Sequence, residues 1–526
     1  MDAQTGRDRI LIASNRGPVS FRHAADGTLT PRRGGGGLVS GLSSVAASAD
    51  VLWVCAALSD ADRAAASAAP GGRLDLAGHA EGVTAGSAVQ MLSVSATTFD
   101  RAYNAVANST LWFIHHLLYD TPNRPHFGIS FRREWESFRI YNAAFADALA
   151  AGAGPADGAG GRVRAMVQDY HLTLAPRMLA DRCPDLPIGW FCHTPWAPPD
   201  YFALLPDSVG REVLEGILGA AHAGFHAERW ASAFLDCCAE FLDAEVDRTA
   251  RTVRYRGHFT TVGVHPLGVD ATELRERAAA SDVQAHVMAL QAAASGTKLI
   301  VRIDRTELSK NIVRGLAAYR ELLITHPEWR GKVTHLAFAY PSRHDLPEYR
   351  EYTASVQRLA REIASEFGTD DWNPIILAVN DDYPRSLAAY RLADVLVVNP
   401  IRDGMNLVAK ECPILSEEGC AVVLSREAGA AAELSEWALM VNPYDVSQTA
   451  QAIHEALTMP DTERKRRTSL LAAAGAALPP TDWLTAQLNA LQPAAPTQVA
   501  QAPAPPPRGR LTRRWRSRRP GRAAGR

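Results

Sequence analysis

Short runs of apolar and β-branched residues alternate along the chain with longer stretches of helix-forming sequence. The runs typical of buried strands are residues 10–13, 51–55, 164–167, 188–192, 298–301, 333–339, 374–378, 395–398, 421–424 and 438–441. Many of them are followed by Gly, Pro, Asn or Ser and then by roughly 10–20 residues of helical pattern. This alternation predicts an α/β fold with largely parallel sheets and helices on both faces.

Two sheets fit the number of strands better than one. A turn-rich stretch at residues 266–270 precedes a long Ala-rich segment, 271–294, for which we expect one helix, and a new strand opens at Lys298. We therefore expect two doubly wound domains, residues 1–268 and 269–492. Ligands of such sheets bind beyond the carboxyl ends of the strands, so we expect a cleft with one ligand on each wall.

The C-terminal segment differs from the rest in composition. Of the 526 positions 47% are hydrophobic and 21% charged, as is usual in globular proteins. Residues 493–526, however, are rich in Pro, Ala and Arg without apolar periodicity, which predicts a disordered tail. The tail carries nine arginines, so the first 507 residues have a net charge of −11. This predicts no nucleic-acid binding by the folded body, and for the tail we favour a solubilising extension over a binding role.

Apolar runs and cysteines indicate the class of protein. No run approaches the ~18 apolar residues of a membrane span, and the first one is too short for the core of a signal peptide. The seven cysteines form no disulfide framework or metal-binding spacing, and we expect Cys237 and Cys238 on a helix. These features predict a cytoplasmic protein with no membrane association and no bound metal.

The first candidate site follows the strand at 10–13. The sequence SNRGP (14–18) is followed by four consecutive glycines, 34–37, and a predicted helix near Leu38. Glycines let backbone N–H groups approach an anion, and the helix directs its positive end toward it. Arg16 can bind a phosphate through two hydrogen bonds. A flexible surface loop is the alternative.

The second candidate site directly follows the strand at 298–301. Arg305 and Lys310 lie five residues apart on an expected loop, where two cations can converge on a diphosphate. At an effective dielectric constant of ~20, each cation ~4 Å away contributes about 4 kcal/mol of attraction before desolvation. A solvated turn of mixed charge is an equally good interpretation.

The third candidate site follows the strand at 395–398, in the sequence NPIRDGMNLVAKE (399–411). A Gly-containing turn between a buried strand and a helix presents backbone N–H groups to an anion. Asp403 can accept hydrogen bonds from hydroxyls beside that anion, and Glu411, roughly two turns later, can hold a ribose. In the alternative, Asn406 is only a helix cap and Glu411 only an exposed charge.

With these segments the chain resembles the trehalose-6-phosphate synthase family, retaining glycosyltransferases (family 20) of the GT-B fold. The most specific segment is RDGMNLVAKE (402–411); the others are SNRGP (14–18), GGLVSG (36–41), YNAVANSTLW (103–112), QDYHL (168–172), HTPW (193–196), RTELSK (305–310), PSR (341–343) and VNPYD (441–445). The resemblance covers about residues 10–491. It implies two Rossmann-like domains that face a central cleft, with the last helix packed back on the first domain.

The resemblance also implies roles for individual residues. The positions that match the binding of glucose 6-phosphate are Arg16, Gly37, Tyr103, Trp112, Asp169 and Arg343. Those that match donor binding are Gly36, Gly37, His193, Arg305, Lys310, Asp403, Gly404, Met405, Asn406, Leu407, Val408 and Glu411. The implied catalytic set is Arg305 and Lys310 on the diphosphate, His193 and Asp403 on the donor glucose, and Asp169, which orients the acceptor.

The implied reaction transfers glucose from a nucleoside diphosphate glucose to glucose 6-phosphate and forms α,α-trehalose 6-phosphate. Transfer on the front face of the sugar, without a metal or other cofactor, is implied, and a homo-oligomer is compatible with the sequence. Two alternatives are a related enzyme with a glycerol phosphate or amino-cyclitol phosphate as acceptor, and a non-catalytic sensor of sugar phosphates.

The chain departs from the family pattern near the donor. Asn311 stands where Gly is usual, residues 306–309 read TELS, and residues 193–197 read HTPWA. These differences alter loop shape without removing a charged contact. Residues 378–382 (AVNDD) lie where the family lines the pocket for the base of the donor. Their sequence does not distinguish uridine from guanine, so UDP-glucose and GDP-glucose are equally supported as donors.

Overall fold

The computed structural model describes residues 8–24, 26–33, 49–75, 88–154, 162–294, 296–343 and 345–491. These residues belong to one compact unit that ends at Leu491. The predicted tail, 493–526, and the run of four glycines lie outside the described residues.

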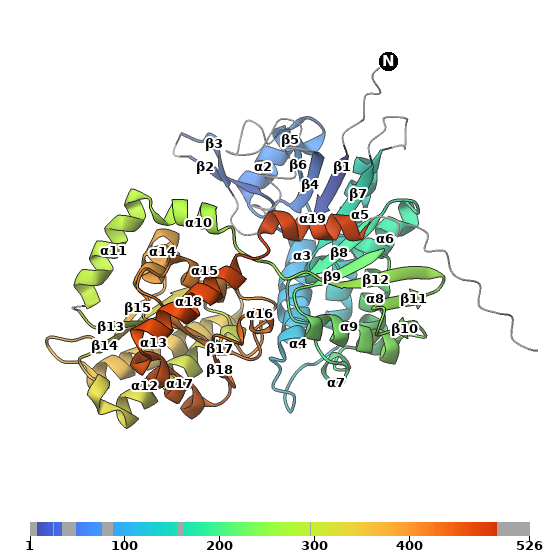
Figure 1. Cartoon of the computed structure of the whole chain (residues 1–526). Helices are drawn as coiled ribbons and strands as arrows, with labels where there is room; N and C mark the ends of the chain where they lie inside the picture. The colour runs from blue at the N-terminus through green and yellow to red at the C-terminus, as the bar shows by residue number, and fades with distance from the viewer. Residues whose placement is uncertain are drawn as a thin grey trace, which may run out of the picture. The chain divides into compact units, whose positions relative to one another are not determined.

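The first half of the chain forms a ten-stranded sheet (Figure 1). Its strand order is β10-β11-β12-β9-β8-β7-β1-β4-β6-β5. The strands are β1 (Arg9–Ala13), β4 (Asp50–Ala56), β5 (Arg73–Asp75), β6 (Ala88–Leu92), β7 (Val163–Gln168), β8 (Ile188–Cys192), β9 (His222–Phe225), β10 (Glu245–Asp247), β11 (Thr252–Tyr255) and β12 (His258–Val264). The pairs from β12–β9 to β4–β6 are parallel, and the edges are antiparallel. A separate hairpin pairs β2 (Val19–His23) with β3 (Leu29–Arg33).

Helices cover both faces of this sheet. Those of the first half are α2 (Asp60–Ala68), η1 (Pro70–Gly72), α3 (Ala96–Phe99), η2 (Asp100–Leu111), α4 (Trp112–His116), α5 (Ile129–Ala153), η3 (Tyr170–Leu172), α6 (Ala175–Arg182), α7 (Pro199–Phe202), α8 (Asp207–Ile217) and α9 (Glu228–Phe241). Because side chains alternate along a strand, Leu11 of β1 joins the core under α5, while its neighbour Ile12 joins the core under α2. Cys237 and Cys238 lie buried on α9, as predicted.

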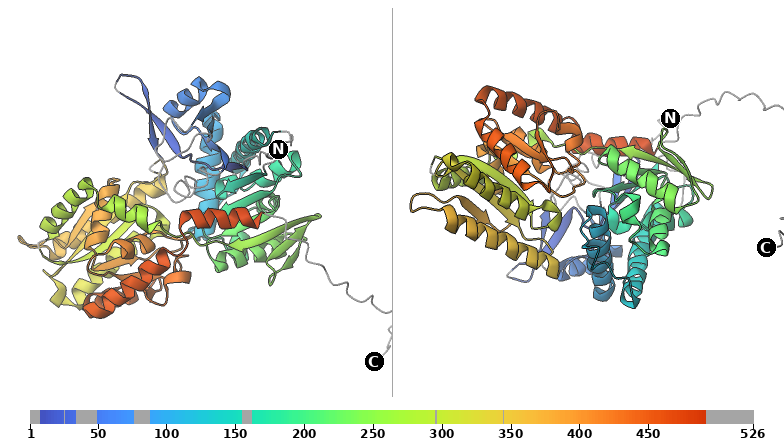
Figure 2. Two further views of the ribbon diagram at one scale, coloured as in Figure 1. Left: turned by 45° about the horizontal axis from the view of Figure 1, so that its top comes forward. Right: turned by 90° about the horizontal axis from the view of Figure 1, so that it is seen from below.

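The second half of the chain forms a six-stranded sheet that is parallel throughout, in the order β15-β14-β13-β16-β17-β18. Its strands are β13 (Lys298–Arg305), β14 (Val333–Tyr340), β15 (Ile375–Ala378), β16 (Val395–Val398), β17 (Ala421–Ser425) and β18 (Leu439–Val441). One core lies under α12 (Ile312–Thr325), α13 (Pro347–Phe367) and α17 (Val446–Thr458). The other lies under α10 (Ala271–Ala278), α11 (Ser281–Ala294), α14 (Tyr383–Leu392), α15 (Val408–Leu415) and α18 (Asp461–Gly475), on the opposite face (Figures 1 and 2). Shorter turns are η4 (Leu308–Lys310), η5 (Pro327–Trp329) and α16 (Ala431–Leu434).

All ten predicted strands are present, and the predicted α/β class is confirmed. The single helix expected over 271–294 is wrong, because the segment divides into α10 and α11. The break lies at residues 279–280, just before Ser281 and Asp282, which suit the first turn of a new helix. Both side-chain oxygens of Asp282 accept hydrogen bonds from Arg277, at 2.9 and 2.6 Å, which link the two helices across the break.

The chain passes between the two sheets twice. The first crossing runs from residue 265 to 270, and the second precedes the last helix, α19 (Pro480–Ala490). The two crossings are hydrogen-bonded to each other, since Gly268 N donates to Leu478 O at 2.7 Å. Trp483 of α19 is buried in the same core as Ile10 and donates from its indole N–H to His265 O. Figures 1 and 2 show this red helix against the first sheet.

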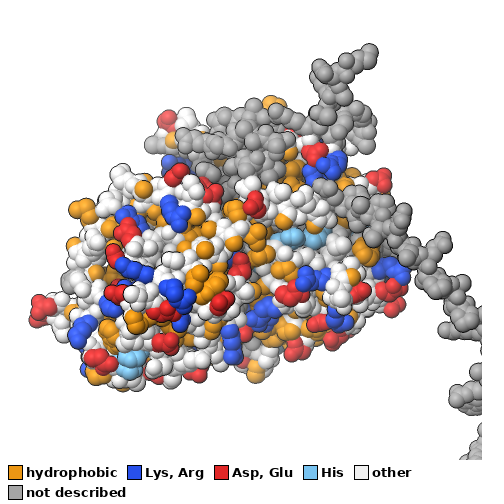
Figure 3. Space-filling model, viewed as in Figure 1, with side chains coloured by type: hydrophobic (Ala, Val, Ile, Leu, Met, Phe, Trp, Pro, Cys, Tyr) orange, Lys and Arg blue, Asp and Glu red, His pale blue; other side chains and the backbone are white. Residues whose placement is uncertain are grey.

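The surface carries both signs of charge. On the face shown in Figure 3, Lys and Arg side chains are interspersed with Asp and Glu. Within the described ranges, no helix combines the length and the apolar character needed to cross a bilayer.

Candidate active site

A cleft of about 520 Å³ opens at the carboxyl ends of β1, β7, β8, β13 and β14, and both sheets contribute to it. This is where ligands of doubly wound sheets bind. Seven residues predicted to bind substrate line it: Arg16, Tyr103, Trp112, Asp169, His193, Arg305 and Arg343. The fold thus brings residues that are up to 327 positions apart in the sequence into one cavity.

Arg343 connects the two walls of the cleft. Its guanidinium lies 4.0 Å from the ring centroid of Trp112, and it donates to the hydroxyls of Tyr349 at 2.7 Å and Tyr170 at 3.2 Å. Burial by itself lowers the pKa of Arg343. The nearby Tyr170, Glu307 and Tyr349 outweigh burial and raise this pKa above its ordinary value, so the side chain stays charged. Arg343 also has a positive φ of 48°, a strained conformation for a residue with a side chain.

The faces of the Trp112 ring are in contact with other side chains. His116 stacks on it at 3.9 Å between centroids, in addition to Arg343. Its indole N–H is buried and has no partner in the described part of the chain. Trp112 is therefore held rigidly in the cleft wall by stacking rather than by a hydrogen bond.

The helix that carries Tyr103 has an unusual geometry. η2 is a π-helix, in which the N–H of Trp112 still bonds to Ala107 O, five residues earlier. Nine residues separate Tyr103 from Trp112, which is about two and a half turns of α-helix and would place them on opposite sides. The wider i→i+5 winding needs more residues per turn. Both side chains accordingly line the same cleft.

Asp169 is fixed by its neighbours at the end of β7. Its carboxylate accepts a hydrogen bond from His193 N at 3.2 Å and lies 3.6 Å from His171 Nδ1. Burial raises the pKa of Asp169, but the hydrogen bond from His171 and the charges of His193 and His171 outweigh it and lower that pKa to about 2. The backbone of Asp169 has a φ of 75°. A charged carboxylate is thus held in a strained backbone position, as is common at functional sites.

His193 follows β8 directly. One ring nitrogen, Nε2, lies 2.9 Å from Gln168 Oε1, which sets the orientation of the imidazole. Burial lowers the pKa of His193, against the charge of Asp169. Burial therefore favours the neutral ring, which offers hydrogen bonds rather than charge.

Lys310 and Asp403 form an ion pair of 2.5 Å that joins the second and third candidate sites. Burial opposes the charge on each, yet their mutual attraction raises the pKa of Lys310 and lowers that of Asp403. Asn406, which has a φ of 81°, donates to the same carboxylate oxygen at 3.0 Å. Asp403 is therefore an ionised carboxylate with its position fixed by two donors.

The turn after Asp403 packs against the first half of the chain. Trp230 donates from its indole N–H to Gly404 O at 3.0 Å, and a Cβ at Gly404 would overlap the backbone oxygen of His193. Only glycine fits there. His193 and Asp403, both predicted to contact the donor sugar, are thereby brought together. The other turn residues predicted to bind the donor, Met405, Leu407 and Val408, lie between this contact and the start of α15.

Glu411 lies on α15 and does not line the cleft. Burial raises its pKa to about 6, against the hydrogen bond that Tyr390 donates at 3.3 Å. In the base-pocket segment, Asp381 lines the cleft and Asp382 caps α14. Gly36 and Gly37 lie outside the described residues.

One group among the described residues could hold a metal ion: His326, Glu328 and His454. None of the three lines the cleft. The two imidazoles are stacked at 3.7 Å with an angle of 10° between their planes. Since nitrogen lone pairs lie in the ring planes, the rings would have to turn before both could bind one ion.

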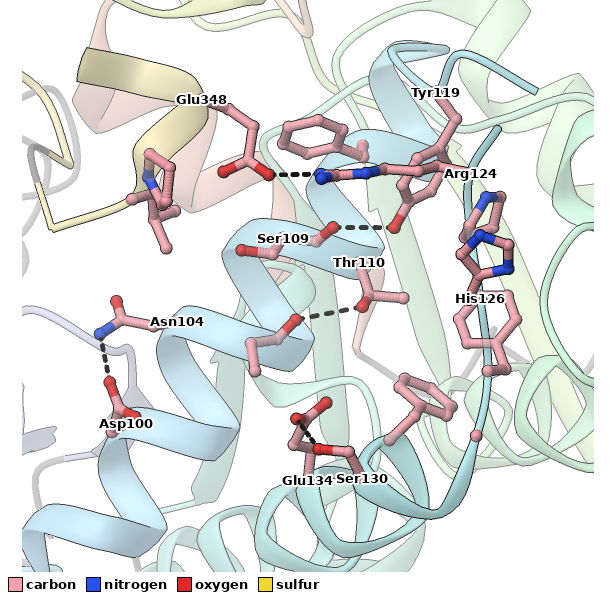
Figure 4. A pocket seen from close by; sticks show the side chains of 18 of the residues that line it. Asp100, Asn104, Ser109, Thr110, Tyr119, Arg124, His126, Ser130, Glu134 and Glu348 are labelled. Carbon is pink, nitrogen blue, oxygen red and sulfur yellow. Dashed lines mark hydrogen bonds and ion pairs between the residues drawn. The ribbon is translucent and has the colours of Figure 1, made fainter. Parts of the chain in front are cut away.

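A second cavity, of about 550 Å³, lies beside η2 (Figure 4). Arg124 from the first half and Glu348 at the start of α13 form an ion pair of 2.7 Å across it. Most of its polar side chains pair with one another, as the hydrogen bonds from Asn104 to Asp100 and from Ser130 to Glu134 show. It contains none of the predicted site residues.

Comparison with known proteins identifies the family. The sequence model of glycosyltransferase family 20 matches residues 8–492. The chain belongs to this family. It is 32% identical to the UDP-forming alpha,alpha-trehalose-phosphate synthase of Schizosaccharomyces pombe, over 88% of this chain and 86% of that protein. It is also 32% identical to a bifunctional trehalose-6-phosphate synthase/phosphatase of Thermoproteus tenax, of which it spans 60%.

Solved structures of the same fold contain ligands. A structure from E. coli with bound UDP-2-fluoro glucose has a TM-score of 0.78 and 27% identity, over 92% of this chain and 99% of that one. An alpha,alpha-trehalose-phosphate synthase (UDP-forming) from Burkholderia xenovorans in complex with glucose-6-phosphate has a TM-score of 0.77 and 26% identity, over 92% of this chain and 100% of that one. The predicted GT-B fold is thereby confirmed.

Among the cleft residues of this family 20 chain that were assigned no role from the sequence are Asn15, Tyr170 and Ser342. Each belongs to a segment that carries the family resemblance, SNRGP, QDYHL or PSR. Tyr170 binds both Asn108 and Arg343, so it links η2 to the second half of the chain. Their place in these segments was the signal from which a role in the site could have been predicted. The contacts of the three side chains, however, arise only on folding.

Proposed function

We propose that this family 20 glycosyltransferase is a trehalose-6-phosphate synthase that transfers glucose from UDP-glucose to glucose 6-phosphate. The observation that carries the proposal is the cleft, in which Arg16, Arg343 and Arg305 converge from strand ends of both sheets. Two anionic substrates must meet in such an enzyme, and each needs cations to bind it. The ligands named for the E. coli and B. xenovorans structures support these two substrates.

The acceptor phosphate would bind between Arg16 and Arg343. Both cations act on His171. Burial lowers the pKa of His171, the nearby Asp169 raises it, and the charges of Arg343 and Arg16 lower it further, which indicates that both guanidinium groups are close to this ring. Arg343 is held by two tyrosine hydroxyls and by the Trp112 ring, so it can present its remaining N–H groups in a fixed geometry. Asp169 would orient the acceptor, since an ionised carboxylate accepts hydrogen bonds from sugar hydroxyls.

The donor diphosphate would bind to Arg305 and Lys310. Negative charge develops on the leaving phosphate as the glycosidic bond breaks, and fixed cations stabilise that charge in the transition state. His193 and Asp403 would hold the glucose hydroxyls next to Gly404. Each group needs only to hold its position, because the ion pair and hydrogen bonds already orient it.

Asp403 is poorly suited to act as a covalent nucleophile. Its carboxylate oxygen Oδ2 accepts hydrogen bonds from both Lys310 and Asn406, which reduces its nucleophilicity. We therefore favour front-face transfer over the two displacements of retaining glycoside hydrolases. In front-face transfer the leaving phosphate oxygen takes the proton of the acceptor hydroxyl, so positioning supplies most of the catalysis.

We further propose that the reaction needs no metal or other cofactor, since the two cations Arg305 and Lys310 can balance the charge of a diphosphate. Treatment with a chelator such as EDTA would then leave the rate unchanged. A cytoplasmic location and a homo-oligomeric state stay predictions from the sequence.

The test is product formation by the purified chain. Glucose 6-phosphate is incubated with UDP-glucose or GDP-glucose, and trehalose 6-phosphate and the released nucleoside diphosphate are measured together. We expect product with UDP-glucose. Product with GDP-glucose alone would correct the donor, product only with a glycerol or amino-cyclitol phosphate would correct the acceptor, and binding without turnover would indicate a sensor.

A further inference from the structure

Glu307 is a fully buried carboxylate between the two cations of the donor site. It lies on the loop after β13, and its side chain is 0% exposed. Oε1 accepts a hydrogen bond from Ser342 Oγ at 2.9 Å and pairs with Arg305 Nη1 at 3.1 Å. Oε2 is buried and has no hydrogen-bond partner in the ranges that the structure covers. Glu307 itself does not line the cleft.

This carboxylate stays ionised because of the cations around it. Burial raises the pKa of Glu307, but Arg305, Arg343 and Lys310, together with the hydrogen bond from Ser342, lower it to about 2. A buried anion with one unsatisfied oxygen is costly for stability. The fold nevertheless keeps this anion at the point where the donor cations meet the loop that carries Arg343.

We propose that Glu307 is a positioning residue that couples the two substrate sites, because one carboxylate oxygen holds both Arg305 of the donor site and Ser342, next to Arg343 of the acceptor site. The inference rests on the proposed function. Arg305 is 54% exposed, so its link to Glu307 limits its freedom on the cleft side. The bond to Ser342 holds a loop in which Arg343 has a strained backbone.

The coupling follows from competition for a shared anion. In the empty cleft, Glu307 is the counter-charge of Arg305, Lys310 and Arg343. A phosphate bound at Arg343 neutralises part of the positive charge of Arg343. The Glu307 carboxylate then interacts less with Arg343 and can hold Arg305 more firmly. Ordered Arg305 then binds the second anion better, and by linkage the effect is reciprocal.

The experiment measures binding of UDP, as a donor-site probe, by titration calorimetry with and without saturating glucose 6-phosphate. For the unmodified chain we expect glucose 6-phosphate to tighten UDP binding by about 10-fold, and for Glu307→Gln by less than about 2-fold. Glu366→Gln is the matched control, because Glu366 pairs with Arg320 at 2.6 Å on the surface of the same half of the chain. It should keep the full coupling.

A second variant guards against loss of folding. Ser342→Ala removes the hydrogen bond to the same carboxylate but keeps every charge, and it should also reduce the coupling. In an Arg305→Ala background, Glu307→Gln should change kcat by less than about 2-fold, because the residue through which it acts is gone. A purely structural role would lower activity in both backgrounds.

The outcomes separate the two proposals. Full coupling in folded Glu307→Gln or Ser342→Ala would overturn the role of Glu307 and leave the synthase assignment intact. An unmodified chain that binds both ligands without coupling would do the same. An unmodified chain that binds neither UDP nor glucose 6-phosphate would overturn the proposed function and the role of Glu307 with it.

Discussion

The guanidinium of Arg343 stacks on the ring of Trp112 at 4.0 Å, although the two residues belong to different halves of the chain. The contact assembles the acceptor site from a loop of one half and a helix of the other. A cation over an aromatic face gains about 0.5–2 kcal/mol. A planar guanidinium can in addition stack on the ring. The acceptor site is therefore complete only while the two halves stay in contact.

Arg343→Lys should raise the KM for glucose 6-phosphate by roughly 10- to 100-fold while kcat falls much less. Lysine keeps the charge but loses the planar stacking and the paired hydrogen bonds. Initial rates at varied glucose 6-phosphate and saturating donor measure this. Arg358→Lys, on the exposed side of α13, is the control and should behave as the unmodified chain. An unchanged KM in Arg343→Lys would remove this residue from the acceptor site.

Arg305→Ala should lower kcat by about 100- to 1000-fold, the usual cost of removing one donor that stabilises transition-state charge. The KM for glucose 6-phosphate should change far less, since Arg305 acts on the leaving group. Steady-state kinetics with both substrates varied separates the two effects. Turnover equal to that of the unmodified chain would refute the role in leaving-group stabilisation.

The donor KM should fall as pH rises through about 6, because Glu411 has a pKa of about 6 and its ionised form accepts hydrogen bonds from ribose better. Measuring the KM for UDP-glucose from pH 5 to pH 8 tests this. Glu411→Gln should abolish this step, whereas Glu417→Gln, at an exposed pair with Arg391, should keep it. A step of the same size in Glu411→Gln would assign it to another group.

The same shift predicts a loss of stability with rising pH. The pKa of Glu411 is higher in the folded chain than its ordinary value of 4.5, so the folded state binds more protons between the two values. The free energy of unfolding should therefore decrease by about 1 kcal/mol from pH 4.5 to pH 6 through this residue, and by about 2 kcal/mol over its whole titration. Glu411→Gln should reduce that decrease in urea unfolding at the two pH values, and an identical slope in the variant would contradict the prediction.

Deletion of Ala105 tests the π-helix η2. One residue fewer changes the angle between Tyr103 and Trp112, so the KM for glucose 6-phosphate should rise more than 10-fold, whereas UDP binding should stay the same. Circular dichroism and the thermal midpoint verify that the variant is folded. A folded variant with unchanged acceptor KM would show that the i→i+5 winding is not needed to place the two rings.

Much of the fold follows from local sequence. Strands such as β1 and β16 are short apolar runs bounded by turn residues, and their length and boundaries indicate buried strands of an α/β chain. The strand ends then place Arg16 and Asp169 at one edge of the first sheet and Arg305 at the corresponding edge of the second, because parallel strands of a sheet share the direction of their carboxyl ends. The family resemblance added the identity of the substrates, which no periodicity contains.

Other features depend on contacts between distant residues, and only the tertiary structure decided them. The strands β10–β12 at one side of the first sheet are partly exposed, so hydrogen bonds with neighbours define them rather than an apolar run. The stacking of Arg343 on Trp112 and the link from Glu307 to Ser342 likewise join segments 231 and 35 positions apart. A sequence determines which groups are available for such pairs, but which groups meet depends on how the sheets pack, and this is a property of the whole chain.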